Sequence, residues 1–515
     1  MFLLLFITVT DVVNAGEYNT YIKNGKIVEE ADFTSADNFQ EIKGHDAIHN
    51  WYFNHSGGYA VKVWNNMNLD ITLAALRTRF FNKDKEVEIY YDNFEGTIHS
   101  ASTYVDYSNR FLLNSIDHEK QHESYIKIRG MNAQILQWSR PSLEKVENDK
   151  PYYASAEIIR NKNEVYTIII KSATPFLNQG EYMDIFRSFQ LIDKKGSAHN
   201  NVVYNSIPKN INEETQRIYH QYFAPETSLT WGIFDPGAPS SFYNLNQLEE
   251  RMDYSFDTII RYHHFSDGDF PMTAMENAYE NNKLVLFTLQ TMDTKSDNTG
   301  ITYDILNGDY EDYFQRLAKD MKAYDHPILF RLNNEMNGDW CPYSGYFSSK
   351  DSSLYIEVWK YVYGIFEENN LENVLWVWNP HDISFPGFSI NHALTYYPGN
   401  QYVDIVGLTG YNTGDYYEGE IWRGFREIYT PLYEEYIEIF QQPLMITEFG
   451  SNSVGGDKIQ WIQEMFQYIR DYDRIKVAIW WSGTDWDNEG NPARIYRLNQ
   501  SEEMLDAFRD GFRDY

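Results

Sequence analysis

Two hydrophobic patterns divide the chain. Between about residues 40 and 195, short runs alternate apolar and polar side chains, as antiparallel strands with one buried face do. These runs are YAVKVWNN, KEVEIYYD, SYIKIRGM, AQILQWSR and EVYTIIIK. The stretch GEYMDIFRSFQLI places Met183, Phe186 and Phe189 at helix-like spacing. We therefore predict a smaller α+β domain with an antiparallel sheet and place it at residues 16–200.

The pattern changes after KKGSAHNNVVYNSIPKN, a polar segment typical of a domain boundary. Short apolar runs then alternate with longer amphipathic ones. The eight candidate strands are LTWGIF, DTIIRYHHF, KLVLFTLQ, PILFRLNNE, NVLWVWNP, VDIVGLTGY, PLMITEFG and KVAIWWS. The helix-like stretches include GDYEDYFQRLAKDMKAY, DSSLYIEVWKYVYGIFEEN and GDKIQWIQEMFQYIRDY. This alternation predicts an α/β domain, a (β/α)8 TIM barrel over residues 205–515, because an open doubly wound sheet has no reason to stop at eight strands.

The fourth predicted strand, PILFRLNNE, ends in polar side chains although its apolar run reads as buried. Arg331, Asn333 and Glu335 share one parity, so we expect them to face the same way. Active sites of such barrels lie at the C-terminal ends of the strands. The pattern therefore places Glu335 at the barrel mouth, with Asn334 beside it.

The seventh predicted strand brings a second carboxylate. Leu444, Ile446 and Glu448 share a parity, and Glu448 falls at the C-terminal end. Paired carboxylates suit glycoside hydrolysis, in which one protonates the leaving oxygen and the other attacks the anomeric carbon. The acid needs desolvation and a nearby negative charge to keep its proton, whereas a neighbouring Arg331 would keep the nucleophile ionised. We therefore expect Glu335 and Glu448 to act as a pair.

Five motifs in this half resemble a known family. In order they are RLNNEMNGDW, WVWNP, YYPGNQYVDIVGLTGYN, ITEFG and AIWWSG, and together they resemble glycoside hydrolase clan A and, within it, the β-mannanase family 26. The resemblance leaves the N-terminal half uncovered. It implies that Glu335 is the general acid/base and Glu448 the nucleophile. It also implies that Tyr411 hydrogen-bonds the nucleophile and that Trp480 or Trp481 forms the floor beneath the sugar. We expect no cofactor.

Asn334 departs from the family pattern. Many members place His before the acid/base, whereas Asn is the habit of the wider clan, where its amide contacts the sugar 2-hydroxyl. Because this hydroxyl is axial in mannose and equatorial in glucose, Asn334 leaves the identity of the sugar open. We expect a retaining endo-β-glycosidase acting on β-1,4-mannan-type polysaccharide. The same mechanism on β-1,3-1,4-glucan, β-1,3-xylan or a bacterial exopolysaccharide is the alternative.

A rival of another class is a non-catalytic carbohydrate-binding or adhesin protein with an inactive barrel. Intact Glu335, Glu448 and Tyr411 argue against this rival, because a binding protein has no need of the three together.

Other side chains near strand ends are candidate sugar contacts, because flat rings stack on sugar faces. Trp231, Trp340 and Trp378 are candidate platforms at or after the first, fourth and fifth strands. His263 or His264, ending the second strand, is a candidate to orient a carboxylate or bind a hydroxyl. The tryptophans expected to pack in the core are Trp359, Trp376 and Trp461.

The single cysteine, Cys341, excludes an intramolecular disulfide framework and a cysteine-built zinc site. Although it follows the acid/base loop, no Cys-His-Asn arrangement surrounds it, so we expect a small buried hydrophobe. The stretches DTKSDNTGITYD and TDWDNEGN are rich in Asp and Asn but lack EF-hand spacing. No metal site is predicted.

The net charge limits the classes of molecule that the protein can bind. A net charge of −32 makes nucleic acid and anionic membranes poor partners, because both need a cationic footprint. Acidity suits solubility and a neutral ligand such as a sugar chain. No stretch beyond the first residues approaches the ~20 apolar residues that a membrane helix needs.

The opening MFLLLFITVTDVVNA predicts a secretory signal at residues 1–15 with cleavage after Ala15. The basic segment that usually opens such a signal is missing. Two alternatives therefore stay open: the true start lies upstream, or the segment is an ordinary strand. We expect a secreted or cell-surface bacterial protein whose N-terminal domain binds a polymer or cell surface.

Overall fold

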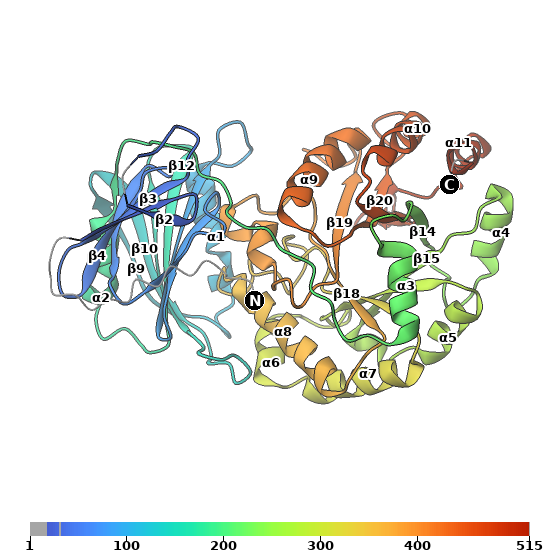
Figure 1. The fold of residues 1–515 in the computed structure, drawn as a ribbon, viewed down its shortest axis with the longest axis horizontal. Helices are drawn as coiled ribbons and strands as arrows, with labels where there is room; N and C mark the ends of the chain where they lie inside the picture. Colours follow the sequence, from blue (N-terminus) through green and yellow to red (C-terminus); the bar gives the residue numbers. More distant parts are fainter. Residues whose placement is uncertain (1–17, 30–31, 514) are drawn as a thin grey trace.

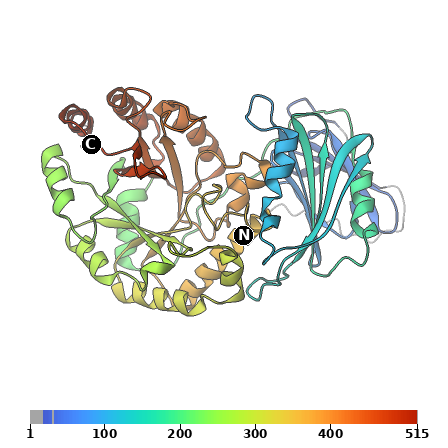
Figure 2. The same cartoon turned by 180° about the vertical axis from the view of Figure 1, so that it is seen from behind.

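The computed structural model describes residues 18–29, 32–513 and 515, and within them the chain forms two units (Figure 1). An N-terminal pair of antiparallel sheets lies beside a C-terminal closed barrel of parallel strands, as Figure 2 also shows from behind. The predicted class, a (β/α)8 barrel preceded by an antiparallel sheet domain, is confirmed. The predicted signal at residues 1–15 lies outside the described residues.

The N-terminal unit is a sandwich of two sheets. Their orders are β13-β5-β4-β3-β1-β2 and β6-β7-β8-β12-β11-β10-β9. Apolar side chains between them form one core that includes Tyr52, Val87 and Ile168. The predicted runs correspond to β5, β8, β9, β10 and β12, and the predicted helix is α2. The strands are β1 Asn19–Lys23, β2 Lys26–Val28, β3 Phe39–Gly44, β4 His49–Asn54, β5 Tyr59–Trp64, β6 Asn68–Asp70, β7 Arg77–Phe81, β8 Lys85–Asn93, β9 Glu119–Ile128, β10 Met131–Ser139, β11 Tyr152–Ile159, β12 Glu164–Ser172 and β13 Gln190–Leu191.

The eight predicted barrel strands are all present, in chain order around the ring, and β14 closes the barrel by pairing in parallel with β21. They are β14 Thr230–Phe234, β15 Thr258–His264, β16 Leu284–Gln290, β17 Ile328–Leu332, β18 Val374–Trp378, β19 Ile405–Asn412, β20 Leu444–Ser451 and β21 Ile475–Trp481. A hairpin of β22 Thr484–Trp486 and β23 Pro492–Ile495 follows the last barrel strand.

Helices cover the outside of the barrel, and several begin at side-chain caps. Asn212, Asp457 and Ser501 each accept a backbone N–H three residues on, which satisfies donors that the first turn leaves free. The α-helices of the described residues are α1 Ala101–Ser108, α2 Gly180–Ser188, α3 Glu213–Phe223, α4 Tyr243–Met252, α5 Met272–Glu280, α6 Ile301–Asn307, α7 Glu311–Tyr324, α8 Ser353–Glu368, α9 Phe425–Ile439, α10 Lys458–Tyr468 and α11 Glu502–Phe512. Short 3-10 turns are η1 Arg110–Leu113, η2 Phe265–Asp267, η3 Ser389–Asn391, η4 Ala393–Tyr396 and η5 Ile469–Asp471.

Both faces of the barrel strands are buried. Inward side chains such as Leu329 and Met445 form an interior core with Tyr222 and Phe223 of α3. Outward side chains such as Phe330 pack against the surrounding helices in a second, larger core. Apolar residues therefore occupy both parities of each strand, as in parallel sheets covered on both sides.

One face of the seven-stranded sheet packs against the barrel through an apolar core. Tyr90 and Trp138 of this sheet and Tyr104 of α1 share that core with Phe388 and Ile390 of the barrel. Figures 1 and 2 agree that α1 lies on the barrel side of the sandwich and α2 on the far side.

Buried charges join the same two surfaces. Lys350 Nζ lies 2.5 Å from Glu157 Oε1, and neither side chain is exposed to solvent. Lys171 of β12 lies 2.8 Å from Asp351 Oδ1, and Tyr153 donates to the other oxygen of Asp351 at 2.9 Å. Because buried charges are costly unless paired, these contacts hold the two units in one arrangement.

A search of the described residues for a helix long and apolar enough to span a membrane finds none.

Candidate active site

A cleft of about 900 Å³ opens at the C-terminal ends of the barrel strands and contains both predicted carboxylates, Glu335 and Glu448. Most of its lining comes from the loops that follow the strands, and one residue comes from the N-terminal sandwich. The lining residues are Ile98, Tyr262, Gln290, Asn334, Glu335, Asp339, Trp340, His381, Ile383, Phe385, Tyr411, Thr413, Glu418, Gly419, Glu420, Ile421, Arg423, Glu448, Trp481, Asp485, Arg494 and Tyr496.

Glu335 reaches the cleft through a strained turn. Strand β17 ends before Asn333, so the predicted shared parity of Arg331, Asn333 and Glu335 is wrong. Asn333 and Glu335 adopt left-handed backbone angles, with φ of 53° and 55°. This conformation costs a residue other than glycine ~1–2 kcal/mol. The Asn333 amide offsets part of that cost, because it accepts from the Thr291 N–H at 2.8 Å and donates to the Thr291 hydroxyl at 2.9 Å.

Glu448 reaches the cleft through a β-bulge. Leu444 and Ile446 point outward into the core beneath the helices, and a regular strand would send Glu448 the same way. The predicted shared parity of these three residues is therefore wrong. Consecutive residues of β19 pair with Ile446 and Glu448, which leaves Thr447 as the extra residue of the bulge. The bulge turns Glu448 inward.

Both oxygens of Glu448 have polar partners. Nη2 of Arg331 lies 2.5 Å from Oε1, and the Tyr411 hydroxyl donates to Oε2 at 2.9 Å. Arg331 is fully buried on the inward face of β17, where its Nε donates to Thr288 Oγ1 at 2.7 Å. The charge and the direction of the Glu448 carboxylate are thus fixed from two sides.

Asn379, directly after β18, connects the two carboxylates. Its carbonyl accepts the Glu335 N–H at 2.8 Å, and its side-chain oxygen accepts Arg331 Nη1 at 2.9 Å. Gly407 lies against this amide, where a Cβ would stand 2.8 Å from the Asn379 Cβ. Only glycine therefore leaves room for Asn379 in this position.

Glu335 is the carboxylate that keeps a proton. Burial raises the pKa of Glu335 to about 7, the charge of His381 opposes that rise, and the negative charge of Glu448 adds to it. The indole N–H of Trp340 donates to Glu335 Oε2 at 3.2 Å. The cleft thus pairs a carboxylic acid that titrates near neutral pH with a carboxylate held by a cation, and this division suits acid-assisted displacement.

Asn334 lies next to the acid in a chain of hydrogen bonds. Its side-chain oxygen accepts from Gln290 Nε2 at 3.0 Å, and Gln290 Oε1 lies 2.7 Å from His264 Nε2. The Tyr343 hydroxyl donates to the Asn334 carbonyl at 2.8 Å. The Asn334 side chain is thereby held in place where it lines the cleft.

The segment that carries the cleft matches a known protein family. The model of glycosyl hydrolase family 26 matches residues 263–452, a segment that contains both carboxylates, Asn334 and Tyr411. The C-terminal barrel is a family 26 domain.

Two relatives illustrate the likeness. Endoglucanase H of Acetivibrio thermocellus is 31% identical over 283 residues, which cover 53% of this chain and 29% of that protein. A mannan endo-1,4-beta-mannosidase of Bacillus subtilis is 39% identical over 95 residues, which cover 17% of this chain and 24% of that protein. The chain thus spans less than a third of the length of either relative.

Among solved structures, the catalytic domain of the Bacillus sp. JAMB-750 GH26 endo-beta-1,4-mannanase matches with a TM-score of 0.46 and 17% sequence identity. The match covers 61% of this chain and 93% of that one.

Two of the predicted tryptophans line the cleft of the family 26 domain. Trp340 is half exposed beside Glu335, and Trp481 stacks on Phe234 with ring centroids 5.2 Å apart and meets Tyr411 edge-on. Of the two candidates for the floor beneath the sugar, Trp481 is the one that lines the cleft. Trp480 faces outward, where it donates to the Tyr496 carbonyl at 2.8 Å.

The predictions for Trp231 and Trp378 as sugar platforms are wrong. Both are buried and point outward toward the helices, Trp378 against Tyr397 at 5.1 Å and Trp231 against Phe466 at 5.1 Å. The tryptophans predicted to pack in the core, Trp359, Trp376 and Trp461, do so.

His263 was a candidate for the cleft, and that prediction is also wrong. Its ring points outward beside Phe287, with Nε2 3.2 Å from the Gly268 carbonyl. The inward residues of β15 are Tyr262, which lines the cleft, and His264, which supports Gln290.

Tyr262, Gln290 and His381 are cleft residues that the sequence reasoning missed. Gln290 and His381 lie at or directly after the C-terminal end of a predicted strand, so their position along the chain points to the cleft. Tyr262 lies two residues before the end of β15, where the apolar pattern does not separate it from the outward His263. Tyr262 stands over the Arg331 guanidinium at 5.6 Å, and His381 meets the Trp340 ring edge-on at 5.2 Å.

Cys341 is buried, with Sγ 3.7 Å from the Asn334 carbonyl, and burial raises the pKa of its thiol. A raised pKa leaves a thiol unreactive. Within the described part of the chain, no group of three His, Cys, Asp or Glu side chains is arranged to hold a metal ion.

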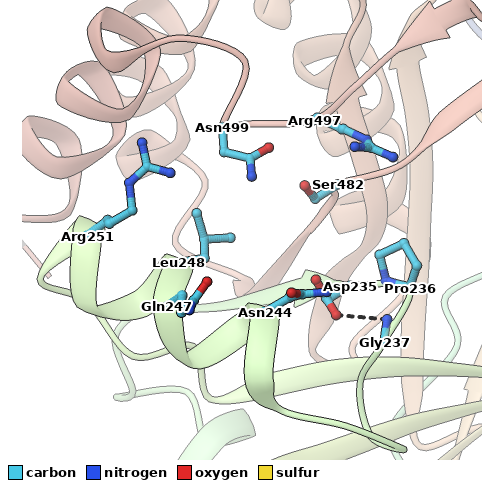
Figure 3. A pocket seen from close by; sticks show the side chains of 10 residues that line it. All are labelled: Asp235, Pro236, Gly237, Asn244, Gln247, Leu248, Arg251, Ser482, Arg497 and Asn499. Atoms are coloured by element: carbon cyan, nitrogen blue, oxygen red, sulfur yellow. Dashed lines mark hydrogen bonds between the residues drawn. The ribbon is translucent and has the colours of Figure 1, made fainter.

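A second hollow, of about 400 Å³, lies at the rim of the family 26 barrel between the loop after β14 and the segment before α11 (Figure 3). Its one carboxylate, Asp235, accepts the N–H groups of Gly237 and Ala238 at 2.8 and 3.1 Å. Arg251 and Arg497 also line it. With a single carboxylate already engaged in a turn, this hollow lacks the pair that hydrolysis needs.

Proposed function

We propose that the chain is a retaining endo-β-glycosidase that hydrolyses β-1,4-mannan-type polysaccharide by double displacement. The observation that carries this proposal is the division of labour between Glu335, whose pKa is raised to about 7, and Glu448, held by Arg331 and Tyr411. Glu335 protonates the leaving oxygen while Glu448 attacks the anomeric carbon. Glu335 then removes a proton from water, which attacks the glycosyl-enzyme and releases the sugar with its configuration retained.

The mannan assignment is supported by relatives. The Bacillus subtilis relative carries the name mannan endo-1,4-beta-mannosidase, as do three others from bacteria, including one from Bifidobacterium adolescentis. These matches cover between 90 and 135 residues each.

A second polymer, β-1,3-1,4-glucan, is favoured by two observations. A relative that matches 283 residues of this chain is named Endoglucanase H. In addition, Asn334 occupies the position beside the acid where many family members have His, and there it faces the cleft. The mechanism is the same for both polymers.

The test is reducing-sugar release by wild type, Glu448→Ala and a control, Glu438→Ala, which alters an exposed residue of α9. The substrates are glucomannan, galactomannan, mixed-linkage glucan, β-1,3-xylan and a bacterial exopolysaccharide. We expect wild type and control to cut a mannan and Glu448→Ala to cut none. Cleavage of the glucan, xylan or exopolysaccharide alone would keep the mechanism and change the substrate. Binding without cleavage would favour the carbohydrate-binding or adhesin alternative.

Retention is tested separately. Proton NMR of the first products distinguishes the β-anomer expected of a retaining enzyme from the α-anomer that an inverting enzyme would release. An initial α-anomer would contradict the role of Glu448 as nucleophile.

We also propose that the protein acts outside the cell and that its sandwich binds polymer. The leader-like segment 1–15 supports export. Trp51 and Phe53 lie half-buried with ring centroids 6.0 Å apart on the outer side of β4, away from the sandwich core, and their flat rings suit sugar faces. Protein detected only in the cell fraction would refute export. Unchanged pull-down by insoluble mannan after Trp51→Ala would refute polymer binding at this face.

A further inference from the structure

Several apolar side chains that line the cleft are exposed to solvent. Trp340, Ile383 and Phe385 of the barrel are 49%, 41% and 44% exposed, and Ile98 of the sandwich is 93% exposed. Ile421, in the loop after β19, is a fifth exposed apolar residue of the lining, at 66%. Singly exposed apolar residues are common on protein surfaces, but five lining the same cleft are not scattered. We call Trp340, Ile383, Phe385 and Ile98 the apolar end of the cleft.

The sandwich holds the barrel loop that carries Ile383 and Phe385. Asp92 of β8 accepts the Ser389 N–H at 2.7 Å, and the Ser389 hydroxyl donates to the Tyr91 carbonyl at 3.1 Å. Phe388 inserts beside α1, with its ring centroid 4.7 Å from that of Tyr104 and 5.2 Å from that of His99. Because His99 follows Ile98 directly, the contact that fixes the loop also sets where Ile98 stands.

The same loop is tied to the segment that carries the acid. Asn337, two residues after Glu335, accepts the Phe385 N–H at 2.9 Å and donates to the His381 carbonyl at 3.0 Å. The sandwich also reaches this segment directly, because the Tyr107 hydroxyl donates to Asp339 at 2.5 Å. The apolar end is thus assembled by both units and anchored next to the acid/base residue.

We infer that the sandwich supplies part of a sugar-binding subsite on the leaving-group side of the cleavage point, with Ile98 opposite Trp340, Ile383 and Phe385. This inference rests on the proposed function. Trp340 donates to Glu335, the group that protonates the leaving oxygen, so the side chains around Trp340 lie where the departing sugar would be. Trp481 and Tyr411 lie at Glu448 and serve the sugar that is attacked.

The ligand chemistry follows from the lining. Apolar side chains suit the C–H-bearing faces of a neutral pyranose ring and offer nothing to an anionic or zwitterionic group. The occupant is therefore a sugar residue of a neutral β-linked polysaccharide, beyond the bond that is cut. A short substrate with a phenol as leaving group does not reach Ile98.

The test uses the full chain with Ile98→Asp and a matched control, Leu177→Asp. Leu177 is equally exposed, at 91%, three residues before α2, the helix that lies on the side of the sandwich away from the barrel. kcat/KM is measured on a β-1,4-linked hexasaccharide and on a 4-nitrophenyl disaccharide. We expect Ile98→Asp to lower kcat/KM on the hexasaccharide about three- to ten-fold, the value of one apolar contact, and to leave the nitrophenyl substrate unchanged. Equal behaviour of the two variants, or an equal loss on both substrates, would overturn the inference.

Binding separates this inference from the proposed function. In a Glu448→Ala background, calorimetry gives Kd for mannohexaose and for a mixed-linkage glucan hexasaccharide without turnover. A three- to ten-fold weaker Kd with Ile98→Asp supports the subsite even if the wild type hydrolyses neither sugar. Unchanged Kd, or no binding of either hexasaccharide, overturns it.

Discussion

Nη2 of Arg331 lies 2.5 Å from Oε1 of Glu448 on the floor of the cleft, where the Arg331 side chain has no exposure to solvent. Arg331 also donates through Nε to Thr288 and through Nη1 to Asn379, so the guanidinium is held in place as well as the carboxylate. Removing one partner of such a pair leaves the other buried without compensation, which costs ~3–5 kcal/mol.

Replacing Arg331 tests this pair. We expect Arg331→Met to lower the free energy of unfolding by about 3–5 kcal/mol and to abolish polysaccharide cleavage. The double variant Arg331→Met/Glu448→Gln removes the uncompensated charge and should regain most of the stability without activity. Urea unfolding and reducing-sugar release measure the two effects. If Arg331→Met is as stable and as active as Glu438→Ala, the ion pair contributes neither to stability nor to catalysis.

The Tyr411 hydroxyl is tested against a close control. Tyr411→Phe removes the hydrogen bond to Glu448 Oε2, whereas Tyr429→Phe removes one to the Gly410 carbonyl, also at 2.9 Å. Both should lose about 1 kcal/mol of stability. Only Tyr411→Phe should lower kcat/KM, by about 10- to 100-fold, because its partner carries the reaction. Equal activities would remove Tyr411 from the mechanism.

The raised pKa of Glu335 predicts that activity falls on the alkaline side of the pH profile. The acid works protonated, so kcat/KM on polysaccharide should fall as pH rises through about 7. A 2,4-dinitrophenyl glycoside has a leaving group that needs no proton, and its glycosylation step should lack that fall. Profiles from pH 5 to 9 measure both. The same fall with both substrates would assign it to another group.

The same pKa affects stability. A carboxyl whose pKa is raised in the folded state stabilises the fold fully below its unfolded value, here 4.5, and that contribution is lost as pH rises to and through about 7. Glu335→Gln cannot ionise, so its Tm relative to wild type should increase between pH 4 and 8. The gain corresponds to about 1–3 kcal/mol. Calorimetry at several pH values measures it, and a constant difference would contradict the assignment.

The ion pair between Lys350 and Glu157 predicts that the two units unfold together. Both side chains are completely buried where the sandwich meets the barrel. Lys350→Met should destabilise the chain by ~3–5 kcal/mol, and Lys350→Met/Glu157→Gln should recover most of that loss. Wild type should show one thermal transition. Two separated transitions, with only one shifted by Lys350→Met, would mean that the contact does not couple the units.

The sequence predicted the strands of the barrel well and the direction of their side chains poorly. The apolar runs are long enough to locate each strand, but helices cover the outside and other side chains fill the inside, so both parities are apolar. Period-2 counting therefore could not tell the outward His263, Trp378 and Trp480 from the inward Tyr262 and Trp481.

Glu335 and Glu448 both line the cleft, but neither reaches it through the strand parity that the sequence pattern suggests. Each departs from regular strand geometry, one through the left-handed turn after β17 and the other through the bulge at Thr447. Position at a strand end predicted them, whereas parity did not. Bulges and positive φ angles depend on tertiary contacts, such as that of Asn333 with Thr291, which a sequence does not display.

The buried charges between the units bear on how such a protein can be cut and recombined. A fragment beginning near residue 205 would carry Lys350 and Asp351 to its surface without Glu157 and Lys171, and it would expose Phe388. It would also lose the support of Ser389 next to the cleft. The sandwich is therefore a poor candidate for domain shuffling, and a chimaera that replaces it must supply a matching charged face.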